Sequence, residues 1–213
     1  MTALMDTGPR ETALEKHGEV HGVAIAVVTQ NKDDESQCRV KVRYPWHDKP
    51  RDSYWARLAM PMAGKDRGLV TIPEVGDEVL VAFERNDIRF PHVLGSLYSQ
   101  KNTTPFANDD GKNDKRIFKS RKKHYLLYDD GTKGVVELAH EKGRKLTLDD
   151  DGIVVQDGSG NKLTIDSNSG AVTIEATGSL TIKAATISIQ STGTLEIKAS
   201  ATVTVQGSLV SIN

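Results

Sequence analysis

The fold of this chain is decided by the stretch AVTIEATGSLTIKAATISIQSTGTLEIKASATVTVQGSLVSIN, which runs from residue 171 to residue 213. Aliphatic residues recur in pairs with one residue between the two members, and small or hydroxyl-bearing residues separate most successive pairs. Because successive side chains of a strand point to opposite faces, each pair predicts a short strand with one apolar face. The apolar positions of the first five pairs are Val172, Ile174, Leu180, Ile182, Ile187, Ile189, Leu195, Ile197, Val203 and Val205.

The same pairing begins upstream, and the repeat is about eight residues long. The further pairs are Val136/Leu138, Leu146/Leu148, Ile153/Val155, Leu163/Ile165 and Val210/Ile212. Before Gly170 the spacing varies and Asp–Gly turns are frequent, whereas after it the spacing is regular. We therefore expect a neck or transition over residues 125–169 and a regular β-helical shaft with its tip over residues 170–213.

Two architectures satisfy this pattern. One is a flat antiparallel meander within a single chain, which would leave one apolar face of the sheet uncovered and prone to aggregation. The other is an intertwined homotrimer, in which three chains supply three sides of a prism and the apolar pairs meet at a shared axis. We favour the trimer, because small aliphatic side chains suit a narrow axis and no helix or second sheet remains in the sequence to cover the face.

The composition agrees with a two-part chain. Of the 213 residues, 28 are basic and 29 acidic, which argues against a protein that coats nucleic acid. One cysteine, Cys38, excludes an intrachain disulfide, and no apolar run is long enough to span a membrane as a helix. The first 18 residues lack the apolar core of a signal peptide, so we expect synthesis in the cytoplasm. No aromatic residue follows Tyr128.

Residues 19–99 read as a five-stranded barrel of the OB type, because period-2 runs alternate with turn residues. The expected strands are His21–Thr29, Arg39–Trp46, Trp55–Gly64, residues 79–83 and Pro91–Ser99. In the second, Val40, Val42 and Tyr44 face inward and Arg39, Lys41 and Arg43 outward. We expect residues 1–18 to form an N-terminal arm, helical or disordered, and residues 100–124 to form a polar, basic linker.

Two segments of this barrel resemble a known family. GLVTIPEVGDEVLVAF at Gly68–Phe83 and PHVLGSLYS at Pro91–Ser99 resemble the OB-fold signature of VgrG proteins and of phage baseplate assembly protein V-like spikes. The eight-residue repeat resembles the triple-stranded β-helix of the same proteins. The positions that carry the OB motif are Pro73, Glu74, Val75, Gly76, Asp77, Glu78, Gly95, Ser96, Leu97 and Tyr98.

The resemblance implies a trimeric central spike of a contractile injection system, assembled at the baseplate tip of a phage tail, tailocin, type VI-like or extracellular particle. It implies an OB domain that docks to a hub protein, here expected to be a separate chain because only about 20 residues precede the barrel. It also implies a PAAR-type tip protein and transient contact with the target cell envelope. We expect the tip protein to rest on an apolar platform formed by Leu209, Val210, Ile212 and Asn213.

Catalytic chemistry has little support in the sequence. The six histidines are dispersed, His47 beside Asp48 reads as a loop residue, and the acidic residues around Gly76 read as a turn. Asp149, Asp150 and Asp151 could hold a cation, but a solvated turn explains them more simply. We therefore expect no enzyme activity, cofactor, metal or nucleic-acid partner. The alternative functions are an OB-fold binding module with an adhesive β tail, which would use Arg39, Lys41 and Arg43, and an enzyme acting on an envelope polymer.

Overall fold

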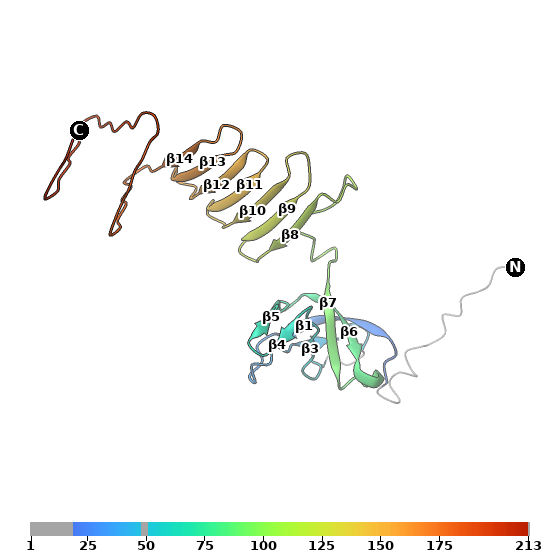
Figure 1. The fold of residues 1–213 in the computed structure, drawn as a ribbon. Helices are drawn as coiled ribbons and strands as arrows, with labels where there is room; N and C mark the ends of the chain where they lie inside the picture. Colours follow the sequence, from blue (N-terminus) through green and yellow to red (C-terminus); the bar gives the residue numbers. More distant parts are fainter. Residues whose placement is uncertain (1–18, 48–50, 213) are drawn as a thin grey trace. The chain divides into compact units, whose positions relative to one another are not determined.

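The chain folds as two units that meet between Asn113 and Asp114. The computed structural model describes residues 19–47 and 51–212 (Figure 1), so the expected N-terminal arm and Asn213 lie outside the described residues. Apart from one 3₁₀ turn, η1 (Glu84–Asn86), every regular element in these ranges is a strand. The expected all-β class is therefore confirmed. No helix in the described ranges is long and apolar enough to cross a membrane.

The first unit is built on a five-stranded sheet with the order β2-β1-β6-β7-β3. Its strands are β1 (Val23–Gln30), β2 (Lys41–Arg43), β3 (Arg57–Leu58), β6 (Glu78–Phe83) and β7 (Pro91–Leu97). A bridge between Val40 and Ala56 joins the two ends of the sheet through paired backbone hydrogen bonds of 3.0 and 2.7 Å. The sheet thus curls around an interior, and a short hairpin, β4 (Ala63–Gly64) and β5 (Arg67–Gly68), stands outside it.

The interior of this unit holds small aliphatic residues and one aromatic cluster. Val40, Val42, Ala56, Val79 and Val81 are fully buried, as the inward alternation of the second and fourth expected strands predicts. The Tyr44 ring lies 5.3 Å from the ring of Trp46 and 5.6 Å from that of Phe83, which closes one end of the core. The core is therefore complete within the first unit.

One local expectation for this unit needs correction, and one strand shows a burial that the sequence pattern left open. The segment expected as one strand over residues 55–64 is broken into β3 and β4, and the pairing strand β5 was missed. In β1 the core takes Ala26 and Val28, while Val23 and Ile25 stay about half exposed. Both faces of this strand are apolar in sequence, so the pattern does not say which one is buried. The smaller alanine suits the interior of a narrow barrel.

The second unit is a seven-stranded antiparallel meander in which every strand pairs with its sequence neighbours (Figure 1). The strands are β8 (Lys115–Lys119), β9 (Tyr125–Asp129), β10 (Val135–Ala139), β11 (Lys145–Asp149), β12 (Gly152–Gln156), β13 (Lys162–Asp166) and β14 (Val172–Glu175). β8 lies in the segment expected as linker, because its sequence, KRIFK, shows no period-2 alternation of apolar and polar residues. Between residues 115 and 175 the chain therefore takes the meander architecture, with strands paired inside one chain.

Residues 176–212 contain no strand, and no backbone-to-backbone hydrogen bond of the described residues involves them. All of these residues are exposed. The eight-residue repeat continues through this segment without a strand partner in the described chain. An apolar repeat whose backbone N–H and C=O groups lack strand pairing is a template for pairing with another strand.

Candidate functional site: the uncovered apolar face of the second unit

The register of the meander arranges the aliphatic pairs into two columns that run across the sheet. In the first column Val136 pairs with Leu148, Leu148 with Ile153, Ile153 with Ile165 and Ile165 with Val172. In the second column Leu138 pairs with Leu146, Leu146 with Val155, Val155 with Leu163 and Leu163 with Ile174. We call these columns the apolar face, because directly opposed residues of an antiparallel pair share one side of the sheet.

The apolar face is open to solvent along its length. Leu138 is 57% exposed and Ile174 is 59% exposed, and no element of the described chain covers them. Contiguous apolar surface of this extent marks an interaction site in soluble proteins. The face therefore requires a partner.

The predicted axis residues beyond β14 are equally exposed. Val172 and Ile174 lie in β14, whereas Leu180, Ile182, Ile187, Ile189, Leu195, Ile197, Val203 and Val205 lie in the unpaired segment, each at least half exposed. Of the expected tip platform, Leu209 and Ile212 are 84% and 91% exposed, Val210 is about half exposed, and Asn213 is outside the described residues. A single chain thus brings none of these residues into a core.

The opposite side of the sheet carries a buried carboxylate. Glu137 is 8% exposed and accepts hydrogen bonds from Lys145 Nζ at 2.7 Å, from Thr147 Oγ1 at 3.1 Å and from the hydroxyl of Tyr125. Burial alone would raise the pKa of Glu137, but the hydrogen bonds from Lys145 and Tyr125 outweigh it and keep the pKa below its ordinary value. This network joins β9, β10 and β11 and stiffens the polar side.

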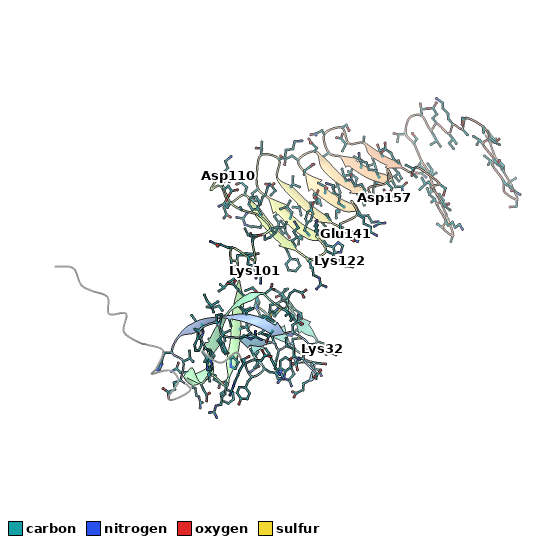
Figure 2. All side chains as sticks on the ribbon, turned by 180° about the vertical axis from the view of Figure 1, so that it is seen from behind. Lys32, Lys101, Asp110, Lys122, Glu141 and Asp157 are labelled. Carbon is teal, nitrogen blue, oxygen red and sulfur yellow. The ribbon has the colours of Figure 1, made fainter. Side chains whose placement is uncertain are left out.

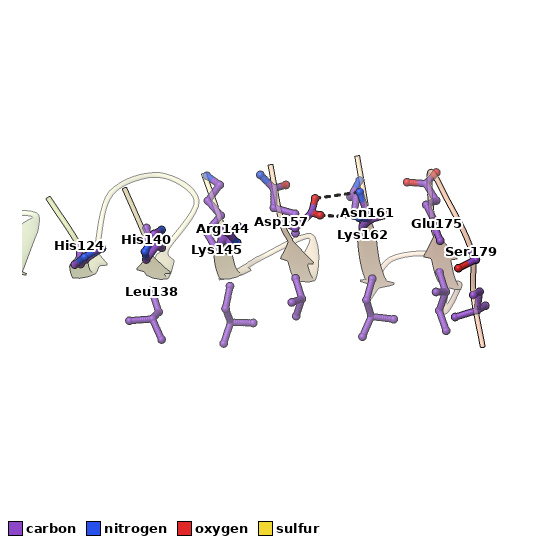
Figure 3. A pocket seen from close by; sticks show the side chains of 18 residues that line it. His124, Leu138, His140, Arg144, Lys145, Asp157, Asn161, Lys162, Glu175 and Ser179 are labelled. Atoms are coloured by element: carbon purple, nitrogen blue, oxygen red, sulfur yellow. Dashed lines mark hydrogen bonds between the residues drawn. The ribbon is translucent and has the colours of Figure 1, made fainter. Parts of the chain in front are cut away.

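A groove of about 860 Å³ runs along one margin of the apolar face and is lined by Leu138, Val155 and Ile174. Figure 3 shows Leu138 on the side of the sheet away from the labelled charged residues. The rim of the groove carries His124 and His140, whose rings lie 4.4 Å apart, and the Arg144 side chain. The Nδ1 atom of His124 accepts the backbone N–H of Glu141 at 3.2 Å, and Nδ1 of His140 accepts that of Lys142 at 3.2 Å. The groove is therefore lined by apolar residues of the sheet face and by charged residues of both signs, Asp157 and Glu175 among them.

The residues of the OB motif build a turn and two strand ends. Asp77 accepts the backbone N–H of Glu74 at 2.9 Å, and the Gly76 N–H donates to the carbonyl of Val28 at 2.8 Å. Gly76 has a φ of 97°, which favours glycine. Pro73 is buried and Glu78 begins β6, whereas Glu74 and Val75 are exposed. Gly95, Ser96 and Leu97 end β7, and the adjoining Tyr98 is 72% exposed. The motif thus shapes the barrel.

The outward basic row of β2 is compensated by neighbouring side chains. Arg39 pairs with Asp33 and Glu35, each at 2.9 Å, and Arg43 lies 3.7 Å from Asp52. The Trp55 ring lies 5.0 Å from Lys41 Nζ and 5.5 Å from the Arg39 guanidinium. Sequence reasoning found no aromatic residue with this row, because Trp55 arrives from the next segment of the barrel. These in-chain partners weaken the case for an oligonucleotide surface here.

The candidate chemical residues stay apart in the structure. Asp149 Oδ1 accepts the backbone N–H groups of Asp151 and Gly152 at 3.0 and 3.1 Å, so it caps its own turn. In the described ranges no three histidine, cysteine or acidic residues are close enough together to hold a metal ion. Cys38 is exposed.

Comparison with known proteins points to injection machines. Residues 24–98 match the family model of the type VI secretion system/phage-baseplate injector OB domain. The chain is 37% identical over 102 residues to the type VI secretion system spike protein VgrG3 of Vibrio cholerae, which covers 44% of this chain and 10% of that protein. It is 36% identical over 101 residues to the spike protein VgrG2a of Pseudomonas aeruginosa, covering 44% of this chain and 12% of that protein.

A third relative carries a different name. The actin cross-linking toxin VgrG1 of Vibrio cholerae is 32% identical over 102 residues, covering 44% of this chain and 9% of that protein. The chain thus spans about a tenth of the length of these curated relatives. Residues 24–98 thus resemble the injector OB domain of type VI secretion systems and phage baseplates, and the matched part of the chain resembles VgrG spike proteins.

Proposed function

We propose that this chain is the structural part of a trimeric, cell-puncturing spike in a contractile injection machine. The observation that carries the proposal is the apolar face, two columns of aliphatic residues of which seven are exposed and Leu146, Ile153 and Leu163 half-buried, continued by a repeat without strand pairing over residues 176–212. Three copies with their apolar faces turned to a common axis would cover these columns and close the sheet edges. The product would be a stiff rod.

In this proposal the meander and the following segment contribute differently. Residues 115–175 form one side of a prism from each chain, because their strands already pair within the chain. Residues 176–212 make no backbone-to-backbone hydrogen bond among the described residues, so their strands would pair between chains. Intertwining at this point would make the three chains difficult to separate.

The remaining roles follow from the relatives, which are named as spike proteins. The OB domain would dock onto the hub of the machine, and the exposed Leu209, Val210 and Ile212 would contact a PAAR-type tip protein. The spike would then work at the baseplate tip by transmitting force to the target envelope, with no catalytic step of its own.

The test is the molar mass in solution with a matched pair of substitutions. We expect sedimentation equilibrium to give three times the chain mass for the unsubstituted protein. Ile189→Asp should block assembly, since three carboxylates would meet in an apolar axis and a buried unpaired charge costs several kcal/mol. Ser188→Asp, one residue away and pointing outward, should be tolerated.

Ile189 is 66% exposed in the single chain, so the aspartate would cost little there and any large effect reports an interchain contact. A monomeric unsubstituted protein, or equal behaviour of the two variants, would contradict the proposal. Salt-dependent oligonucleotide binding by the monomer would instead favour the OB binding module.

A further inference from the structure

The two margins of the seven-stranded sheet carry opposite charge. Successive turns of a meander alternate between the two ends of the strands, so every second turn lies at the same edge of the sheet. We call each of these two rows of turns a margin. The basic margin comprises residues 119–125, 139–145, 156–162 and 175–179, with eight basic and three acidic residues. The acidic margin comprises residues 114–115, 129–135, 149–152 and 166–172, with seven acidic and two basic residues. Figure 2 shows Lys122, Glu141 and Asp157 along the basic margin.

Part of this charge is used within the chain. Lys133 pairs with Asp151 at 2.8 Å, Lys115 lies 3.6 Å from Asp129, and Arg116 pairs with Asp130. These pairs compensate only part of the acidic margin, which keeps a net negative charge. On the basic margin, Arg121, Lys122, Lys142 and Arg144 are all exposed. Two net charges of opposite sign therefore flank the apolar face.

The turns of the two margins are also offset from each other by one strand along the sheet. The basic turn at 140–144 lies between β10 and β11. On the opposite margin, the acidic turn at 130–134 lies one strand earlier and the turn at 150–151 one strand later. When two such sheets meet margin to margin without a shift, the basic turn at 140–144 of one copy falls between the acidic turns at 130–134 and 150–151 of the other. The turn at 157–161 carries Asp157 and no basic residue, so this match belongs to the first half of the sheet. Such an arrangement would favour one register of the two sheets and would also attract the two margins to each other.

We propose that the basic margin of each copy docks against the acidic margin of the next copy, which holds the three chains parallel and in register. This inference rests on the proposed trimer. It adds which residues form the contacts between neighbouring chains, which we call the seams. In a closed ring every interface joins two different margins of the same chain. Two copies related by a twofold axis parallel to their strands would instead face basic margin to basic margin, which like-charge repulsion disfavours.

The groove beside the basic margin supports the same occupant. Its floor is apolar, and its lining carries Arg144, Lys145 and Lys162 together with Asp157 and Glu175, with Lys145 already paired to Glu137. The margin of a second copy offers both matching parts, because its acidic turns follow strands that bear the exposed apolar columns. A second copy of this chain therefore satisfies the apolar floor and the charged rim together.

The experiment is a charge reversal made on either margin and then on both. The first variant carries Lys142→Glu and Arg144→Glu, and the second carries Asp130→Lys and Asp150→Lys, all at exposed turn positions. In low salt each variant should dissociate at least about tenfold more readily than the unsubstituted trimer, since like charges would meet at every seam. The chain carrying all four substitutions should recover to within a few-fold, because its seams are complementary again.

Two controls separate the seam from other effects. Lys65→Glu with Arg67→Glu changes the charge by the same amount in the β4–β5 turn of the first unit and should leave the trimer unchanged. Raising the salt to about 0.5 M should shrink the defect of each two-site variant, because screening weakens exposed charge pairs.

The outcomes distinguish the seams from the trimer itself. Normal trimers from both two-site variants, or no recovery in the four-site variant, would overturn the charged seams and leave the spike standing. A monomeric unsubstituted chain would overturn the spike and the seams together.

Discussion

Glu137 is the most constrained charged side chain of the second unit. The residue is 8% exposed, and its partners come from the strands on either side. In the sequence Glu137 stands between Val136 and Leu138, which predicts only that its side chain faces away from this apolar pair. That it is buried, and that Tyr125 lies within hydrogen-bond reach, depends on the pairing of β9 with β10.

The lowered pKa of Glu137 predicts a loss of stability in acid. A carboxylate whose pKa is lower in the folded state stabilises the fold above its unfolded pKa, near the ordinary value of 4.5, and this contribution disappears as the pH falls through the folded pKa. Glu137→Gln should cost on the order of 1 kcal/mol at neutral pH. It should also flatten the decline in melting temperature below about pH 4.5.

Circular dichroism would measure the melting temperature of each variant from about pH 3 to pH 7, a range that spans the titration of carboxylates. Glu141→Gln is the matched control, because Glu141 is exposed in a turn. The same acid sensitivity in Glu137→Gln and in the unsubstituted protein would contradict the assigned network.

At the scale of elements, the tight turns of the meander set the register. Gly152 has a φ of 144° and follows the Asp149 cap at the start of β12. A Cβ at this position would lie 2.0 Å from the carbonyl oxygen of Ile165, so β13 could not approach β12 as it does. The Asp–Gly signals in the sequence predicted turns, but only the pairing reveals this close approach.

Gly152→Ala should therefore destabilise the second unit by roughly 2–4 kcal/mol, the range of a strained backbone combined with a steric clash. Gly170→Ala is the control, because Gly170 also has a positive φ but meets no atom within 4 Å. It should cost about 1–2 kcal/mol. Chemical denaturation of both variants measures the difference, and equal losses would show that the approach of Ile165 is unimportant.

At the scale of the whole molecule, the two units bury apolar surface in different ways. The buried core residues of the first unit, from Val20 to Val93, contact one another within that unit. In the second unit the aliphatic residues form a surface that a single chain leaves open. The first unit can thus bury its core alone, whereas the second unit depends on other chains to cover its apolar face.

A fragment of residues 1–113 should accordingly fold alone and stay monomeric, while the full chain forms trimers. Its core needs no contribution from the second unit, since every member of the cluster lies before Asn113. Sedimentation and amide hydrogen exchange of the fragment measure both properties. An unfolded or trimeric fragment would mean that the assembly surface extends into the barrel.

Much of the architecture could be read from the order of the residues alone. Period-2 alternation predicted the all-β class, the buried Val40 and Val42, and the one-sided aliphatic pairs, because side-chain direction in a strand follows directly from sequence parity. The same parity could not choose between two apolar faces in β1, and it could not recognise β8, whose sequence KRIFK does not alternate.

The tertiary structure decided which strands find partners within the chain. Local sequence is similar in β13 and around Ile189, yet strands pair within the chain only up to Glu175. Pairing requires a neighbour of matching register at about 4.8 Å, and Asp–Gly and other tight turns supply one up to β14. The basic and acidic margins also depend on the fold. Like charges are dispersed along the sequence, and they come to lie at one edge of the sheet because successive turns alternate between its two edges.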